Sequence, residues 1–345
     1  MTTNTLKPAG RDISLDILKG ILTFFVISTH MVSFFPFRPY TYVSARLINI
    51  YVVYTCLMTF SAFMLILGYM CYKAYISRNL PGKLLAKKLL KNFVKTMLTY
   101  FASAIAYVFF IKQDLTASVL RDILLFRYVV EYSEFILSFA AIYIVVFLFA
   151  GPLGRLTKPA WIVLVLMSLA STFIPYERVR EPLLAVFTGS TLFSSFSIFQ
   201  YFCYFITGVY FAKSGMRYNK WLMLLCAVGT LGFIAWRIVF HDYPSRFPPS
   251  LLWICGGFLF VYCAFIFCRH IPVNAVTKLL AVMGRDSLYY MLFSNIVLFA
   301  LRWLTVRLAF DPVGIPLLFF YLFAFALCVF AAWGYTRLRG ALTKK

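Results

Sequence analysis

Three ionisable side chains, Asp16, Lys19 and His30, lie within or beside the first long apolar run of the chain. Ionisable groups inside a membrane-spanning helix are costly, so they are interpreted first as functional. In an α-helix, eleven steps of about 100° bring Lys19 and His30 to within about 20° of one face, roughly 16 Å apart along the axis. Asp16 lies about 40° from that face. A helix over this run therefore predicts one polar stripe that ends at an imidazole.

His30 has the chemistry of a general base, because a neutral imidazole can take a proton from a hydroxyl and return it near neutral pH. The other two histidines lie outside the predicted spans, His241 in an outer loop and His270 at a cytosolic helix end. Two alternatives stay open. Asp16 and Lys19 could form an ordinary ion pair at the membrane face, and His30 could be a satisfied histidine between helices.

Two acidic residues, Glu131 and Glu134, share one face at the outer end of a predicted span. Arg127 stands four residues before Glu131, so a surface ion pair is one interpretation. The other interpretation places Glu134 at the mouth through which a substrate enters.

The eight cysteines all lie within or at the ends of apolar runs, and nothing about them is spaced like a zinc site or a disulfide framework. We interpret them as small core residues. The sequence therefore predicts no metal site.

The amino-acid composition indicates that these side chains lie in a lipid bilayer. Of the 345 residues, 63% are apolar and 13% are charged, against about 45–50% and about 25% in soluble domains. A helical span needs roughly 20 mostly apolar residues. The sequence predicts one all-α integral membrane domain over 1–345 with about ten transmembrane helices, near 13–35, 48–72, 93–111, 130–150, 160–175, 196–212, 221–239, 250–268, 283–305 and 315–336.

Charge predicts the orientation. If the chain alternates from a cytosolic start, 22 of the 33 Lys and Arg fall on the cytosolic side, whereas only Asp12, Asp16 and Asp286 of the 11 acids do. This excess predicts that both ends are cytosolic, with an N-terminal segment over 1–12 and a tail over 337–345. The net charge of +22 is accounted for in this way, so no nucleic-acid partner is expected. The basic run from Lys83 to Lys95 suits anionic lipid headgroups.

The segment Leu15-Asp16-Ile17-Leu18-Lys19-Gly20, followed by His30, resembles the start of the membrane-bound acyltransferase-3 family, in particular its sugar O-acetylase branch, which is related to fucose 4-O-acetylase. That family has a basic residue, ten intervening residues and a histidine in its first helix. Weaker matches follow in the family's order at 65–69, 87–91, 202–208 and 284–290. One departure stands out: many members have a histidine where this chain has Ser294, followed by Asn295.

The resemblance implies transfer of an acyl group, usually acetyl from acetyl-CoA, to a carbohydrate hydroxyl, with no permanently bound cofactor. His30 would be the general base, and an acyl-histidine intermediate is the variant. Lys19, Asp16 and Arg285 would serve the acyl-CoA donor. The implied partners are membrane lipid, acyl-CoA and a carbohydrate acceptor, in a bacterial cytoplasmic (inner) cell membrane. Candidates for lining the acceptor site are Ser294, Asn295, Tyr289, Tyr290 and Glu134.

Two other functions stay open. A transporter or flippase of a lipid-linked saccharide would be expected to have internal repeats and several charges at mid-membrane, and no convincing repeat is found. A non-catalytic, degenerate family member would explain Ser294 in place of the family histidine.

Overall fold

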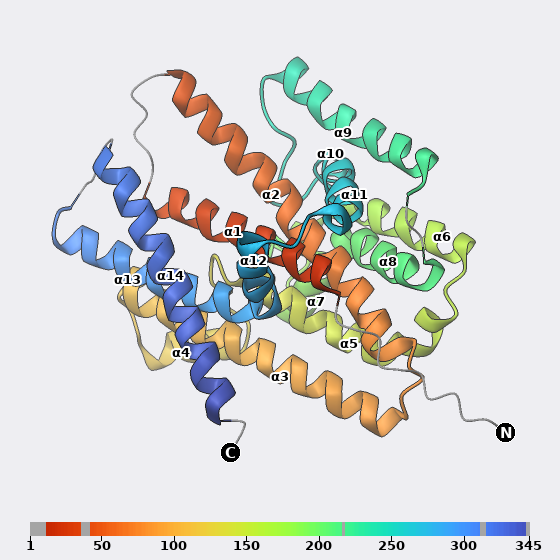
Figure 1. Cartoon of the computed structure of the whole chain (residues 1–345), viewed down its shortest axis with the longest axis horizontal. Coiled ribbons are helices and arrows are strands. Elements are labelled where there is room, and N and C mark those ends of the chain that lie inside the picture. Colours follow the sequence, from red (N-terminus) through yellow and green to blue (C-terminus); the bar gives the residue numbers. More distant parts are fainter. Residues whose placement is uncertain (1–11, 36–41, 216–217, 311–314, 343–345) are drawn as a thin grey trace.

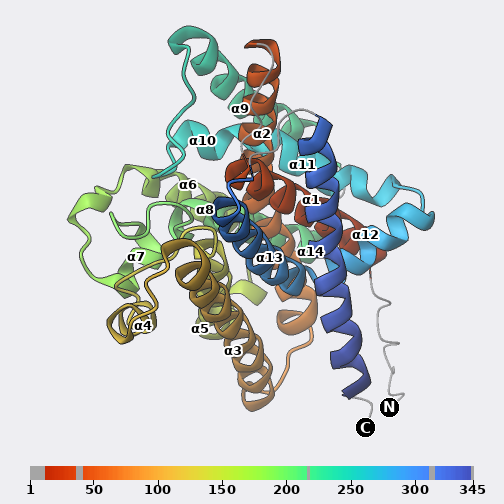
Figure 2. The same cartoon turned by 90° about the vertical axis from the view of Figure 1, so that its left-hand side faces the viewer.

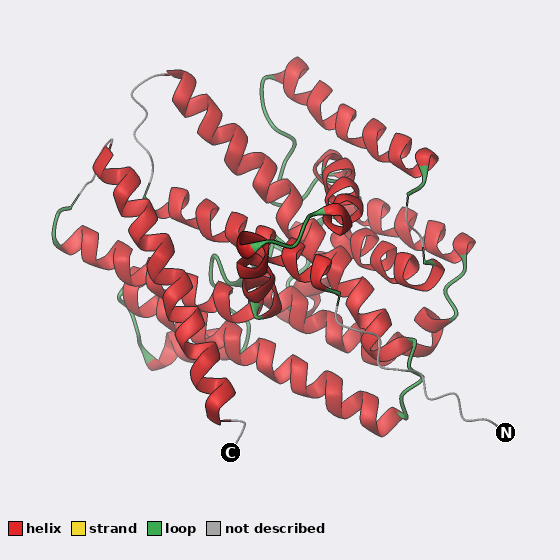
Figure 3. Ribbon diagram, in the orientation of Figure 1, coloured by secondary structure: helices red, strands yellow, loops and turns green. Residues whose placement is uncertain are grey.

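The computed structural model describes residues 12–35, 42–215, 218–310 and 315–342. All regular structure in these ranges is helical (Figure 3), as the sequence predicts. Arg11, most of the segment 1–12 and the end of the tail 337–345 lie outside the described residues. The α-helices are α1 (Ile13–Phe34), α2 (Tyr42–Cys71), α3 (Gly82–Tyr107), α4 (Ala117–Leu124), α5 (Glu134–Gly154), α6 (Lys158–Ala170), α7 (Pro182–Thr188), α8 (Ile198–Ser214), α9 (Lys220–Phe240), α10 (Leu251–Gly256), α11 (Phe258–Phe267), α12 (Ala275–Arg285), α13 (Ser287–Arg307) and α14 (Ile315–Leu342).

Eight helices among the described residues are long and apolar enough to cross a membrane, as in a multi-pass membrane protein. They are α1, α2, α3, α5, α9, the pair α10 and α11, α13 and α14. The other two predicted spans are shorter: Lys158–Phe173 is a short apolar helical segment, and α8 has 17 residues. Many large side chains on α9 and α14 are exposed, which suits contact with lipid.

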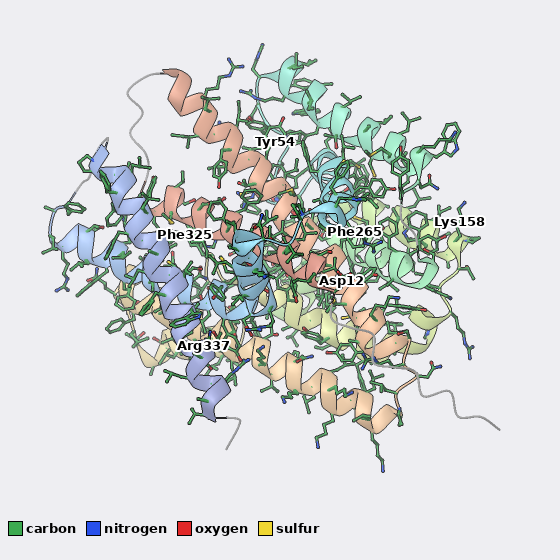
Figure 4. All side chains as sticks on the ribbon, viewed as in Figure 1. Asp12, Tyr54, Lys158, Phe265, Phe325 and Arg337 are labelled. Atoms are coloured by element: carbon green, nitrogen blue, oxygen red, sulfur yellow. The ribbon has the colours of Figure 1, made fainter. Side chains whose placement is uncertain are left out.

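Helix α1 lies in the middle of the helices, and α12 crosses it (Figure 1). The helix begins where Asp12, labelled in Figure 4, accepts a 3.1 Å hydrogen bond from the backbone N–H of Ser14. Such a cap satisfies a donor that the first helical turn leaves unpaired. Figure 2 shows the same helices from the side, with α13 and α14 next to α1.

Four glycines let pairs of helices approach almost to backbone contact. A Cβ added to Gly284 of α12 would lie 1.8 Å from the carbonyl oxygen of Asp16, and one added to Gly20 of α1 would lie 2.0 Å from that of Leu280. Gly68 of α2 and Gly208 of α8 meet each other's helix in the same way. Small residues of this kind allow close packing in membranes. All four belong to the segments that carry the family resemblance, and their role in this fold is to fix helix crossings.

Candidate functional site

The imidazole of His30 is held by an amide from a distant helix. Its Nδ1 lies 3.1 Å from Oδ1 of Asn295 on α13. The amide nitrogen Nδ2 of Asn295 donates to the backbone carbonyl of Tyr132, at 3.0 Å, and to the hydroxyl of Ser103, at 2.9 Å. Because a carbonyl only accepts, this contact assigns the nitrogen of the amide to the Tyr132 side and its oxygen to the His30 side. His30 therefore carries its proton on Nδ1 and keeps a lone pair on Nε2.

The groups around His30 come from four separate parts of the chain. Ser103 on α3 shares a 2.7 Å hydrogen bond with Ser133, just before α5. The neighbouring Tyr132 has a φ of 64°, a left-handed conformation that is uncommon outside glycine and clusters at functional sites. Its ring lies edge-on to the imidazole, with 5.0 Å between ring centroids. Burial, followed by the nearby Glu131 carboxylate, raises the pKa of Tyr132 from its ordinary value.

His30 lines a cavity of about 380 Å³, within the size range of small-molecule sites. The rest of α1 contributes Val26, Thr29 and Ser33 to its wall, and α2 contributes Cys56, Phe60 and Phe63. Loops between helices supply most of the polar groups. The segment before α5 contributes Glu131 and Tyr132, and the loop between α7 and α8 contributes Ser195 and Phe196. The loop between α9 and α10 contributes Arg246 and Phe247.

Both predicted carboxylates line this cavity. Glu134 accepts a hydrogen bond from the Ser195 hydroxyl, and Glu131 accepts one from the Tyr107 hydroxyl at 3.3 Å. Among the described ion pairs, none joins Arg127 to Glu131. The surface ion pair between Arg127 and Glu131 is therefore not formed among the described residues, and Glu131 lines the cavity instead.

A second cavity, of about 260 Å³, contains Lys19. The ammonium of Lys19 lies 2.8 Å from Oδ1 of Asp16, so the ion pair that the sequence allowed is present and borders this cavity. Tyr75 also lines it and belongs to a π-helical turn, Tyr72–Ile76; such turns are frequent at functional sites. Ser287 and Thr96 add hydroxyl groups.

The two cavities share two lining residues, Phe63 of α2 and Phe139 of α5. The ring centroids of Phe63 and Phe139 are 6.1 Å apart, and Phe139 stacks on Phe60 at 5.4 Å. The cavity that holds His30 and the cavity that holds Lys19 therefore adjoin at two aromatic residues, Phe63 and Phe139.

The other predicted residues lie away from both cavities. Arg285 is half exposed and pairs with Asp286 at 3.0 Å. The Ser294 hydroxyl is buried and donates to the Met291 carbonyl of its own helix, at 2.9 Å. Tyr289 is packed between the cations of Lys95 and Arg339, each 4.5 Å from its ring centroid, and Tyr290 is fully buried.

Sequence reasoning missed Tyr132, Ser103, Ser195 and Arg246. Arg246 belongs to the short loop between α9 and α10, whose polar and aromatic composition is visible in the sequence, and that composition is the one signal that could have drawn attention to it. The other three are uncharged residues in an aromatic-rich chain, and their spacing does not relate them to His30.

Comparisons with protein families, with curated proteins and with solved structures find no match. The site is therefore interpreted from its own chemistry. It combines a basic nitrogen with an open lone pair, a cavity with both aromatic and charged walls, and an adjoining cavity with a cation.

Proposed function

We propose that this chain is a membrane-embedded O-acyltransferase that moves an acyl group, in the simplest case acetyl, from cytosolic acyl-CoA to a carbohydrate hydroxyl. The observation that carries this proposal is that the cavity lined by His30, whose Nε2 is left as a base, adjoins the cavity lined by Lys19. The resemblance of the first helix to the acyltransferase-3 family supports the same reaction.

The proposal includes an orientation. We place both chain ends in the cytosol of a bacterial cell, with ten crossings of the cytoplasmic membrane. The short segments Lys158–Phe173 and α8 would be the two crossings beyond the eight long ones, because a bilayer can thin locally around a short span. The Lys19 cavity then faces the cytosol and the His30 cavity faces the outer side.

Lys19 would bind the donor. CoA carries phosphates, and a cation at the mouth of a cavity raises the local concentration of an anion. The step from Lys19 to His30 is roughly 16 Å along α1, which is comparable to the length of an extended pantetheine arm. The arm would pass between Phe63 and Phe139 and bring the thioester to His30.

His30 would then act as general base. As the acceptor oxygen attacks the thioester carbonyl, Nε2 takes the hydroxyl proton. The new C–O bond forms, the C–S bond breaks, and the proton passes from Nε2 to the departing CoA thiolate. Asn295 accepts from Nδ1–H throughout and so stabilises the imidazolium form. In the variant mechanism Nε2 attacks the thioester itself, the C–S bond breaks and the CoA thiolate leaves an acyl-histidine. The acceptor oxygen then takes the acyl group as the C–N bond breaks, and the hydroxyl proton passes to the thiolate.

The experiment that tests this function supplies radiolabelled acetyl-CoA to membranes that contain the wild-type chain. The expected result is label in the glycan or glycolipid fraction of the host membrane. Membranes with His30→Gln should show none, whereas His241→Gln, a matched change in an exposed loop, should behave as the wild type. Absence of transfer by the wild type would contradict the proposal.

One observation favours a second function. Two cavities that adjoin at Phe63 and Phe139 also suit a flippase, in which a lipid-linked saccharide passes from one cavity to the other. Movement of a fluorescent lipid-linked saccharide across proteoliposomes without acetyl-CoA, together with no acyl transfer, would favour this alternative.

A further inference from the structure

Arg246 is a cation in the wall of the His30 cavity. The reaction described above gives it no role. It lies in the loop between α9 and α10 and is half buried. Its guanidinium carbon is 4.3 Å from the ring centroid of Phe247 and 5.9 Å from that of Trp253. Contacts of this kind between a cation and aromatic faces are attractive and restrict the guanidinium.

The loop that carries Arg246 is closed on itself. The N–H of Ser250 donates to the carbonyl of Ser245 at 2.9 Å, and the Ser245 hydroxyl donates to the carbonyl of Pro248, also at 2.9 Å. Ser250 in turn caps α10. Arg246 is therefore presented to the cavity from a loop that is closed by its own hydrogen bonds and joined to the cap of α10, which favours a fixed position for its side chain.

Arg246 forms none of the ion pairs found among the described residues. Yet it lines the same cavity as His30 and Glu134, so its charge acts inside the cavity. A partly desolvated cation is most stable next to a negative charge. Glu131 and Glu134 line the same cavity and would repel an acceptor that is permanently anionic. During the proposed reaction a further negative charge develops in this cavity, on the oxygen of the thioester carbonyl.

We infer that Arg246 donates to the thioester carbonyl oxygen and stabilises the oxyanion that forms when the acceptor attacks beside His30. This assignment rests on the proposed acyltransferase function. As the new C–O bond forms, the carbonyl π electrons move to the oxygen, and the guanidinium holds that negative charge. When the tetrahedral intermediate collapses, the pair returns to the carbonyl and the CoA thiolate leaves. Fixed donors aimed at developing charge are a large part of catalysis in sites of this kind.

The test measures acetyl transfer from radiolabelled acetyl-CoA to the glycolipid extract of the host membrane, with purified protein in liposomes. Arg246→Ala is compared with Arg237→Ala, a matched control whose guanidinium lies against Tyr243, 4.7 Å from its ring centroid, and lines neither cavity. We expect Arg246→Ala to lower kcat by roughly 10²- to 10³-fold, with little change in either KM. Millimolar guanidinium chloride should restore part of the rate to Arg246→Ala and none to the control.

Two outcomes would overturn this assignment while leaving the proposed function intact. One is a rise in the KM for the acceptor with kcat preserved, which would make Arg246 a binding residue. The other is an Arg246→Ala rate equal to that of the wild type. If the wild type itself transfers no label, this result contradicts both the proposed function and the assignment of Arg246. It can be told apart from the two outcomes above, in which the wild type is active.

Discussion

His30 and Asn295 are 265 residues apart in the sequence, and a 3.1 Å contact between Nδ1 and Oδ1 joins them across α1 and α13. The orientation of the Asn295 amide is set by two acceptors on its other side, the Tyr132 carbonyl and the Ser103 hydroxyl. This chain of contacts selects one tautomer of His30, the one with an open lone pair on Nε2. The basicity of the site thus depends on a residue that never touches the substrate in the proposed reaction.

Replacing Asn295 should weaken transfer without removing the base. In Asn295→Leu the Nδ1–H of His30 loses its acceptor, and so the imidazolium formed during proton transfer is less stable. A hydrogen bond to a charged group is worth about 1.5–3 kcal/mol, so we expect a loss of roughly 10- to 100-fold in kcat. Initial rates of label transfer, at equal amounts of folded protein, check this.

Ser294 provides the matched control for Asn295. Its hydroxyl bonds only a carbonyl of its own helix, so Ser294→Ala should transfer label at about the wild-type rate. A large loss in Ser294→Ala with a small one in Asn295→Leu would contradict the role given to Asn295.

Lys19 should govern the use of the donor. Lys19→Met removes the cation next to Asp16. We expect the KM for acetyl-CoA to rise roughly tenfold, the value of about one charge-assisted hydrogen bond, with a smaller effect on kcat. Steady-state kinetics with acetyl-CoA as the varied substrate measure both parameters. Lys278→Met, on the exposed surface of α12, serves as control, and an unchanged donor KM in Lys19→Met would remove Lys19 from the donor site.

The wall formed by Phe63 and Phe139 should decide whether a reagent can pass between the cavities. Native cysteines report on both sides, because Cys56 lines the His30 cavity and Cys71 lines the Lys19 cavity. In a chain that retains only Cys56, a small membrane-impermeant thiol reagent should label that residue from one face of sealed vesicles. Adding Phe139→Ala should open a path and allow labelling from both faces.

Phe147 provides the control for this labelling experiment. It lies on the same helix and is 49% exposed, so Phe147→Ala should leave the labelling one-sided. Equal labelling of Cys56 from both faces in the parent chain would show that the two cavities are already connected.

The crossing of α1 with α12 predicts a strong effect on stability. A methyl group at Gly284 would lie 1.8 Å from the Asp16 carbonyl oxygen, so Gly284→Ala must push the two helices apart. Overpacking usually costs about 1–3 kcal/mol, and we expect at least the upper end of that range, since backbone atoms block the methyl group. Gly334→Ala, where nothing lies within 4 Å of the added Cβ, should melt in detergent at the wild-type temperature. Equal melting temperatures for the two variants would contradict the close crossing.

The sequence predicts what depends on local pattern. Apolar runs long enough to span a bilayer identify most helices, since lipid leaves the backbone few other ways to satisfy its hydrogen bonds. The shared face of Lys19 and His30 follows from helical geometry alone. The Asp16–Lys19 ion pair, which the sequence leaves open as an alternative, depends on a spacing of three residues and is present at 2.8 Å.

Contacts between distant helices could not be predicted in this way. Nothing in the pattern of α13 indicates that Asn295, rather than Ser294, faces His30, because that choice depends on how α13 is rotated against α1. Arg246 reaches the cavity from a loop whose path is set by its own hydrogen bonds. The glycines at 20 and 284 are visible in the sequence, but their pairing appears only when α12 is packed on α1.

The most direct test of His30 as the general base compares two rates of acetyl transfer from acetyl-CoA by purified protein in liposomes. One is the rate of the wild type, and the other is the rate of His30→Gln. Glutamine keeps a polar group of similar reach but cannot take the proton, and general-base catalysis contributes roughly 10²- to 10⁴-fold. We expect His30→Gln to lose at least 10²-fold in kcat while it still binds acetyl-CoA as tightly as the wild type. Transfer by His30→Gln at the wild-type rate would contradict this role of His30.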